Sequence, residues 1–298
     1  VFRLGRWSPL TVSIHNRGPS TTGRLEIVVP GDDALAPDAI FAAALDLPRG
    51  TRKQLHFTVP LKTFAAPLVA KVLAGGKEIT RKELDLRTVF TDSRLIVVVS
   101  RDANLDYLNR ADYLNRAAGA SEGVRSRVVY PHPQSLPRHW RGYDGVEALI
   151  LHGVSLARLS KAQDKALRMW VAQGGLLAVS GGPNFTLLHS PRLASLLPAL
   201  PDGLRQAPSA LALQSVLGET LHVPRPFKLN HVERPRAKVI LSAEGVPLVI
   251  EGKLGAGRVL YLTFDVARYP FDSWTGLANM WHDILDLDQP DSPELRPP

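Results

Sequence analysis

Residues 143–182 read as strand, helix and strand, and this order constrains the fold more than any other part of the chain. Residues 146–151 form a short apolar run without polar alternation, as expected for a strand that is buried on both faces of a parallel sheet. Residues 176–179 form a second such run, which leads into a Ser-Gly-Gly turn at 180–182. We therefore predict a βαβ unit that ends in a sharp glycine turn.

The predicted helix of this unit has recognisable signals at both ends. Ser160 stands three residues before Gln163, which is the spacing of a capping box at a helix start. Gly174 and Gly175 are expected to end the helix, because glycine adopts the left-handed C-cap conformation at little cost. Between these signals the apolar positions fall on one helical face, as in a helix that packs on a sheet.

The alternation of strand and helix extends on both sides of this unit, and we assign residues 91–288 to one α/β domain. Its expected fold is a flavodoxin-like parallel sheet, with a proline-rich insertion at about 183–236 and a polar linker tail at 289–298. The further segments predicted for this domain are strands at 95–99, 128–130, 237–241, 247–250 and 259–264, a helix over the tandem DYLNRA repeat at 106–117, a hairpin turn at 253–258, and a closing helix at 274–285.

Residues 1–90 show short alternating strands with turn-forming residues every 8 to 12 positions. This pattern is typical of an immunoglobulin-like β-sandwich, although the cysteine pair of antibody domains is absent. Trp7 is expected to pack at one end of the sandwich, and a carbohydrate-binding role is the alternative reading for this side chain.

The composition excludes several classes of site. The chain has no cysteine, which removes thiol nucleophiles, disulfides and thiolate metal ligands. The net charge of +8 is spread out without a basic run interleaved with aromatic residues, so we predict no nucleic-acid binding. No metal site is expected either, because His132 and His139 share one loop without the spacing of metal ligands, and the chain lacks HExxH-type motifs. No cofactor is predicted.

Polar residues at the predicted strand ends are the candidates for a functional site, because open α/β sheets bind ligands there. Ser180 lies in a turn that approximates a nucleophile elbow, and it is otherwise a strand-end serine in a glycine turn. His152 either acts as a general base or ligand contact, or fills the rim of the sheet. Asp265, followed by Arg268, either holds a base or a ligand, or caps the loop that follows. The predicted ligand-binding set is His152, Gly153, Ser180, Gly181, Gly182, Asp265 and Arg268.

Residues 143–153, 174–182 and 255–265, the last followed by a tryptophan-containing helix, resemble the class I glutamine amidotransferase-like fold. They resemble in particular its inactive versions in bacterial envelope proteins, which carry an immunoglobulin-like domain after a signal peptide and often a membrane anchor after the α/β domain. The resemblance would place the oxyanion glycine near Gly153, the nucleophilic cysteine at Ser180 or Gly181, and the catalytic histidine at Asp265. Hydrolysis of glutamine by a thiolate is therefore excluded.

These features predict a non-catalytic binding or scaffolding ectodomain of a bacterial cell-envelope protein. We expect an extracytoplasmic location, in the periplasm or at the cell surface, with an anchor to the inner membrane outside this sequence. The expected partners are other envelope proteins or a small polar ligand. One alternative is a serine hydrolase that uses Ser180 with His152 or His189. The other is a glycan-binding module, for which Trp7, Trp140 and Tyr143 are the aromatic candidates.

Overall fold

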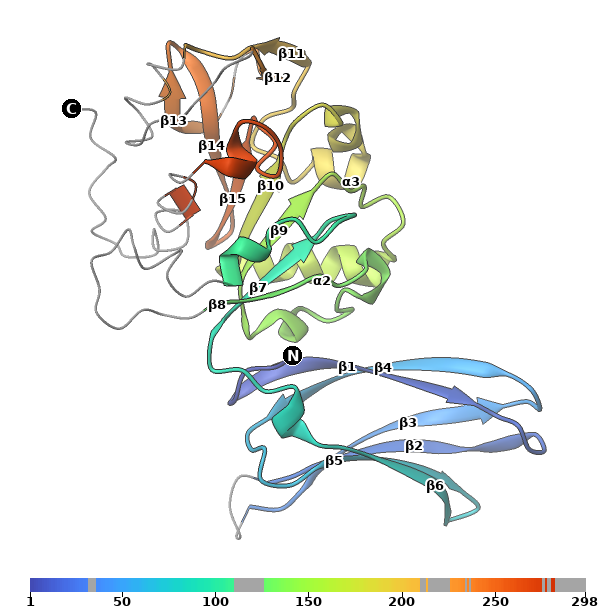
Figure 1. Ribbon diagram of the computed structural model, residues 1–298. Coiled ribbons are helices and arrows are strands. Elements are labelled where there is room, and N and C mark those ends of the chain that lie inside the picture. Colours follow the sequence, from blue (N-terminus) through green and yellow to red (C-terminus); the bar gives the residue numbers. More distant parts are fainter. Residues whose placement is uncertain are drawn as a thin grey trace. The chain divides into compact units, whose positions relative to one another are not determined.

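The computed structural model describes residues 1–31, 36–109, 126–209, 213, 226–233, 235, 237–274, 277, 280 and 281 (Figure 1). The chain divides into two compact units. Unit 1 consists of Val1–Asp92 and Pro137–Gly145, and unit 2 consists of Ser93–Leu136 and Val146–Pro298. The segment at 137–145 therefore belongs to the first unit although it lies between strands of the second.

Unit 1 is built from antiparallel strands in two sheets, one with the order β1-β4 and one with the order β3-β2-β5-β6. A 3₁₀ turn, η1 (Leu86–Thr88), follows the last strand. The strands are β1 (Arg6–His15), β2 (Thr21–Val29), β3 (Ala39–Leu47), β4 (Arg52–Leu61), β5 (Leu68–Ala74) and β6 (Lys77–Leu84).

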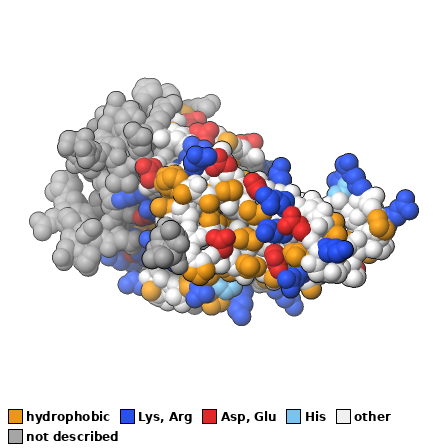
Figure 2. Space-filling model, turned by 90° about the horizontal axis from the view of Figure 1, so that it is seen from below, with side chains coloured by type: hydrophobic (Ala, Val, Ile, Leu, Met, Phe, Trp, Pro, Cys, Tyr) orange, Lys and Arg blue, Asp and Glu red, His pale blue; other side chains and the backbone are white. Residues whose placement is uncertain are grey.

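The two sheets of unit 1 lie face to face and share one apolar core (Figure 1). Leu25 and Ile27 of β2 are buried in it together with Val59 and Leu61 of β4. Polar residues alternate with these positions and face outward. Figure 2, a view from below, shows hydrophobic side chains on this surface interspersed with Lys, Arg, Asp and Glu. The alternation of the sequence thus separates a buried face from a mixed outer face.

The predicted immunoglobulin-like sandwich is wrong for unit 1. Its described residues form six strands in sheets of two and four, whereas the constant-type immunoglobulin domain has seven strands in sheets of four and three. Alternation identifies strands in a sequence, but the pairing of strands depends on contacts between distant segments, which the pattern does not encode.

Unit 2 contains a seven-stranded sheet with the order β13-β14-β15-β10-β9-β7-β8. The pairs from β8 to β15 are parallel, and β14 and β13 are antiparallel additions at the β15 edge. The strands are β7 (Arg94–Val99), β8 (Ser126–Val129), β9 (Val146–His152), β10 (Leu176–Ser180), β13 (Lys238–Ala243), β14 (Val246–Leu254) and β15 (Gly257–Leu262).

The sheet of unit 2 is therefore mixed. The predicted parallel sheet is compatible with its five strands from β8 to β15, but a purely parallel sheet is wrong because β13 and β14 are antiparallel. The reason lies in two tight connections. Glu244 and Gly245 both have positive φ, 48° and 71°, and join β13 to β14, which is the geometry of a type I′ hairpin turn. Gly255 and Ala256 join β14 to β15. Connections this short permit only antiparallel pairing, because parallel strands need a crossover of a dozen or more residues.

Helix α2 (Lys161–Ala172) joins β9 to β10, as the sequence predicts. Ser160 and Gln163 form the expected capping box, and Gly174 adopts a φ of 115° after the helix. Leu167 and Trp170 are buried on the face of the helix that packs on the sheet (Figure 1). The opposite face of the sheet contributes to the main apolar core of unit 2. Burial on both faces explains the unbroken apolar runs of the central strands.

The proline-rich stretch from 183 to 236 holds short elements that pack on unit 2. They are η5 (Phe185–His189), α3 (Pro191–Ala194), β11 (Gly203–Gln206) and β12 (Lys228–His231), and β11 pairs with β12. Other short turns of the chain are η2 (Asp106–Asn109), η3 (Pro133–Ser135), η4 (Trp140–Tyr143) and η6 (Phe271–Ser273).

Three sequence predictions fall wholly or partly outside the described residues. Only 106–109 of the tandem repeat are described, as the 3₁₀ turn η2. Of the expected closing helix, Trp274, Leu277, Met280 and Trp281 are described, and all four are buried in the core of unit 2. The tail at 289–298 is not described. Within the described residues, no helix combines the length and apolar character needed to cross a membrane.

The hairpin between β14 and β15 packs closely on α2. A substitution at this contact tests the packing of the hairpin on the helix. A Cβ atom at Gly257 would lie 1.7 Å from the Val171 carbonyl oxygen and 2.6 Å from that of Gly175. We expect Gly257→Ala to lower the free energy of unfolding by about 3 kcal/mol, because backbone must move to admit the methyl group. Gly203→Ala is the matched control, since its Cβ would meet no atom within 4 Å. Chemical denaturation of both variants measures the difference, and an equal effect would contradict the packing.

Candidate functional site

The candidate site lies at the carboxyl ends of three adjacent strands of unit 2. His152 ends β9 and is paired in register with Ser180 at the end of β10, which is paired in turn with Leu262 of β15. Residues in one row of a sheet project from the same face. The fold therefore brings His152 and Ser180 to one edge of the sheet, as predicted from their positions at strand ends.

Asp265 reaches His152 from the loop after β15. Its Oδ1 lies 2.7 Å from His152 Nε2 and accepts a hydrogen bond of 3.1 Å from the backbone N–H of Ala267. Its Oδ2 lies 3.3 Å from Nε of Arg268. The side chains of His152 and Asp265 are only 11% and 12% exposed, whereas that of Arg268 is 60% exposed. An ionised carboxylate accepts but does not donate, so Nε2 of His152 carries the proton of this bond.

Ser180 holds the loop that carries Asp265. Its hydroxyl donates to the carbonyl oxygen of Phe264 at 3.1 Å and accepts from the N–H of Val266 at 3.2 Å. The residue is 3% exposed. Both hydrogen bonds go to backbone groups on either side of Asp265, so Ser180 fixes the turn from which the carboxylate crosses the end of β10. The hydroxyl acts as a positioning group, with no histidine partner among the described residues.

The glycine turn after Ser180 is fixed by Asn230 of β12. The Asn230 amide donates to the Gly182 carbonyl and accepts from the Gly182 N–H, each at 2.9 Å, and it also accepts from the Tyr261 hydroxyl at 2.8 Å. Gly182 has a φ of 114°, and a Cβ there would lie 2.7 Å from Cβ of Asp265. Glycine is therefore required at this position for the carboxylate to pass.

These groups line a cavity of about 130 Å³ at the edge of the sheet. The exposed residues Arg101 and Asp102, which follow β7, form one side of it. His152, Gly153, Ser180 and the Asp265 loop form the floor, and apolar residues of the segments after β9 and β10 complete the wall. The lining residues are Arg101, Asp102, Leu151, His152, Gly153, Val154, Val179, Ser180, Gly181, Asn184, Phe185, Leu187, Leu188, Leu193, Asp265 and Arg268.

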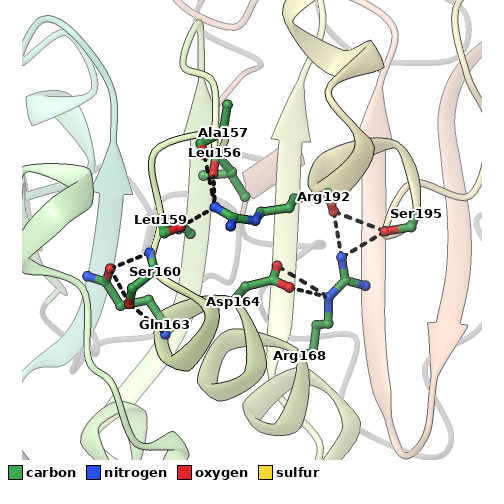
Figure 3. Close-up of polar contacts among 9 residues, drawn as sticks. All are labelled: Leu156, Ala157, Leu159, Ser160, Gln163, Asp164, Arg168, Arg192 and Ser195. Carbon is green, nitrogen blue, oxygen red and sulfur yellow. Dashed lines mark hydrogen bonds and ion pairs between the residues drawn. The ribbon is translucent and has the colours of Figure 1, made fainter.

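Arg192 joins the two segments that form the apolar wall (Figure 3). Its Nη1 donates to the carbonyl oxygens of Leu156, Ala157 and Leu159, all in the segment after β9. The Arg192 carbonyl in turn accepts a hydrogen bond of 2.7 Å from Nη2 of Arg168 on α2. Hydrogen bonds thus connect the cavity wall to the helix that packs on the sheet.

The polar groups of the cavity can bind a ligand but lack the parts of a nucleophilic triad. Nδ1 of His152 has no hydrogen-bond partner among the described residues, and in the neutral ring with the proton on Nε2 it is an acceptor. The nearest hydroxyl in the row, that of Ser180, is occupied by backbone. No cluster of three or more possible metal ligands occurs in the described part of the chain.

The structure gathers most of the predicted ligand-binding residues in this cavity. Six of the seven line it, and Gly182 lies directly behind Asp265. His189 does not join the site, because its Nε2 lies 2.7 Å from the Pro201 carbonyl oxygen. His132 and His139 each accept a backbone N–H at the start of a 3₁₀ turn.

Sequence reasoning missed four residues of the site and its supports, namely Arg101, Asp102, Asn230 and Arg192. The first two directly follow the apolar run of β7, so the rule that located His152 also applied to them. Asn230 and Arg192 act through contacts with distant backbone, and no local pattern marks them.

Comparison with known proteins gives a family match for the first unit only. A domain of unknown function, DUF8726, matches residues 1–87. No curated protein matches the chain. Among solved structures, an exo-β-1,4-mannosidase from Opitutaceae bacterium strain TAV5 is 19% identical, with a TM-score of 0.40, and the match covers 67% of this chain. This chain thus spans only 37% of the length of the mannosidase.

Two smaller proteins match over nearly their whole length. A cytoplasmic protein from Salmonella typhimurium is 14% identical over 65% of this chain and 98% of its own, with a TM-score of 0.45. A putative ThuA-like protein from Bacteroides uniformis is 14% identical over 69% and 98%, with a TM-score of 0.37. None of the three is described as glutamine amidotransferase-like or immunoglobulin-like. With TM-scores below 0.5, they assign no activity to this chain, and the amidotransferase-like resemblance stays a prediction.

The positioning role of Ser180 predicts the effect of its removal. Ser180→Ala leaves the buried N–H of Val266 and the carbonyl of Phe264 without their partner, and we expect a loss of about 2 kcal/mol in the free energy of unfolding. Ser155→Ala is the control, since that hydroxyl accepts one local bond of 3.2 Å from Ala157 in a partly exposed loop. Urea unfolding of both variants provides the measurement, and a Ser180→Ala variant as stable as the control would refute the role.

The same geometry predicts the reactivity of Ser180. A fluorophosphonate, which labels activated serine nucleophiles, is expected to leave the native protein unmodified, because the hydroxyl is buried and bonded to backbone. Intact-mass spectrometry after incubation detects the label. Modification that maps to Ser180 and disappears in Ser180→Ala would restore the serine hydrolase alternative.

Proposed function

We propose that unit 2 binds a small polar ligand at the His152–Asp265 pair and does not transform it. The observation that carries this proposal is the pair itself, two ionisable side chains held 2.7 Å apart and almost buried at the floor of a cavity. Burying polar groups costs free energy unless they are hydrogen-bonded. Nδ1 of His152 still lacks a partner among the described residues, and a bound ligand would supply one.

The volume of the cavity limits the size of the ligand. A cavity of roughly 150 Å³ holds a benzene-sized molecule, so a cavity of about 130 Å³ accepts a ligand, or part of one, with about six non-hydrogen atoms. A glycan chain does not fit within it. The alternative of a glycan-binding module receives no support from this site.

The charges around the cavity favour a small carboxylate that also carries a hydroxyl or amide group. Arg101 and Arg268 present guanidinium donors, which match a carboxylate in geometry and charge. Nδ1 of His152 and the carboxylate of Asp102 are acceptors for a hydroxyl or an N–H. Asp265 itself is occupied on both oxygens and serves to orient His152.

The absence of cysteine from the sequence and the engagement of Ser180 by backbone support binding without turnover. The chain contains no cysteine, and Asp265 stands where the amidotransferase resemblance places a histidine. A general base alone, without a nucleophile or a metal to activate, supplies a small part of a hydrolytic barrier. Placement in the bacterial envelope, with other envelope proteins as partners, remains part of this proposal and rests on the resemblance.

Lactate is a suitable probe, because it combines a carboxylate and a hydroxyl in a molecule of the size that the cavity admits. We expect lactate at about 10 mM to raise the melting temperature, since this concentration stabilises by about 1.4 kcal/mol if the Kd is about 1 mM. Propane-1,2-diol, which lacks the carboxylate, is expected to have no effect. Differential scanning calorimetry measures both.

His152→Gln is expected to weaken lactate binding at least about tenfold, because the oriented acceptor is lost. His231→Gln is the matched control. His231 belongs to a second His–Asp pair of unit 2, 2.5 Å from Asp202, but its side chain is 39% exposed and outside the cavity. Equal loss of binding in the two variants, or no response to lactate and other small carboxylates in the native protein, would contradict the proposal.

A further inference from the structure

Four flat side chains form a continuous stack on unit 1, and none of them lines the cavity. The guanidinium carbon of Arg141 lies 5.2 Å from the ring centroid of Trp7 and 5.2 Å from that of Trp140. The ring of His139 stacks on Trp140 with a centroid distance of 5.9 Å and an interplanar angle of 27°. Trp7 lies in β1, and the other three lie in the 137–145 segment that belongs to the same unit.

The described part of the chain provides no counter-ion for the guanidinium of Arg141. Among the described residues, none accepts a hydrogen bond from this side chain or forms an ion pair with it; its contacts are the two indole rings. The residue is exposed. A guanidinium has five N–H donors at its edge, and stacking occupies only its faces. The donors of Arg141 are thus directed away from the rings and available to a ligand.

The backbone around Arg141 is also fixed. Nδ1 of His139 accepts the backbone N–H of Arg141 at 3.3 Å and caps the turn η4. Gly142 is buried so closely against Pro137 that a Cβ would lie 2.6 Å from Cβ of that proline. A side chain that is already ordered loses less conformational entropy on binding, which favours affinity.

The surroundings of this stack carry an excess of positive charge. Arg6 and Arg138 are exposed, and the carboxylate of Asp144 lies near Arg6. Its Oδ1 is 3.7 Å from Arg6, and its Oδ2 accepts the backbone N–H of Trp7 at 3.0 Å. The charge of Arg138 acts on His56 of β4, whose pKa is lowered first by burial and then by this guanidinium. Among the described residues, Asp144 thus has Arg6 and the backbone of Trp7 as its partners, and it forms no ion pair with Arg138 or Arg141.

We propose that Arg141, held between two indole rings, is a binding site for a phosphate group, with Arg6 of β1 and Arg138 of the same segment as further cations of this part of unit 1. Arginine recognises phosphate through two parallel N–H···O bonds, and a planar guanidinium fixed by stacking presents that fork in one orientation. A phosphate carries the charge and the number of acceptor oxygens to engage neighbouring guanidinium groups as well. The group could belong to free phosphate or to the headgroup of an anionic lipid, and the experiment below separates these sources.

Titration of the full chain with inorganic phosphate, followed through the arginine Nε–H signals by NMR, tests the site. We expect saturable binding that falls at least about tenfold in Arg141→Gln, a loss equal to about 1.4 kcal/mol. Arg141→Lys keeps the charge and is expected to lose most of the affinity, because an ammonium lacks the fork. Arg52→Gln is the control, since Arg52 is an exposed arginine at the opposite end of the β1–β4 pair.

Co-sedimentation with vesicles identifies the source of the phosphate. Binding to phosphatidylglycerol vesicles but not to phosphatidylcholine vesicles, lost in Arg141→Gln, would assign the site to an anionic lipid headgroup. Binding of inorganic phosphate without vesicle binding would assign it to free phosphate. Melting temperatures of the variants close to that of the native protein confirm folding, and Arg138→Gln offers a second variant if Arg141→Gln unfolds.

Two results would overturn the proposal. The first is equal weakening of phosphate binding in Arg141→Gln and Arg52→Gln, which would show attraction to general positive charge. The second is native affinity in both Arg141→Gln and Arg141→Lys, which would show that the guanidinium serves only to attach the 137–145 segment to β1.

Discussion

The contact between Asp265 and His152 depends on a carboxylate that crosses the end of an intervening strand. β10 separates the strands from which the two side chains come, so the loop after β15 must be held over it. Two hydrogen bonds from the Ser180 hydroxyl hold the loop, and a glycine at 182 leaves room for the carboxylate. The strand order thus makes these two supports necessary. The Ser180 hydroxyl is engaged by the backbone of the loop, and Gly182 provides the space through which the carboxylate passes.

The local features of unit 2 could be predicted from the sequence, because neighbouring residues determine them. The capping box at Ser160 and the buried runs of β9 and β10 follow from spacing and apolar pattern. The grouping of His152, Ser180 and Asp265 follows from the rule that parallel strands end at one edge. Their roles could not be predicted. Whether Ser180 faces a histidine or a backbone carbonyl depends on the path of a loop some 84 residues later in the chain.

Sheet architecture was predicted less well than strand positions. The predicted hairpin turn at 253–258 is found at Gly255-Ala256, and the equally short Glu244-Gly245 connection, which was not recognised in the sequence, makes β13 antiparallel as well. In unit 1 the strands themselves alternate as expected, but pairing β1 with β4 and β2 with β5 is a long-range choice. The Arg141 stack has the same origin, because Trp7 and the 137–145 segment meet only in the folded chain.

The assignment of 137–145 to unit 1 has a consequence for how this protein can be divided. The chain passes from one unit to the other at 92/93, at 136/137 and at 145/146, so no single cut separates them. The family match to residues 1–87 ends well before this segment. A fragment trimmed to that match would lose the partner of Trp7 and the carboxylate that accepts its backbone N–H. Unit 1 is thus a discontinuous domain, completed by a piece of chain that is synthesised only after part of unit 2 has been made.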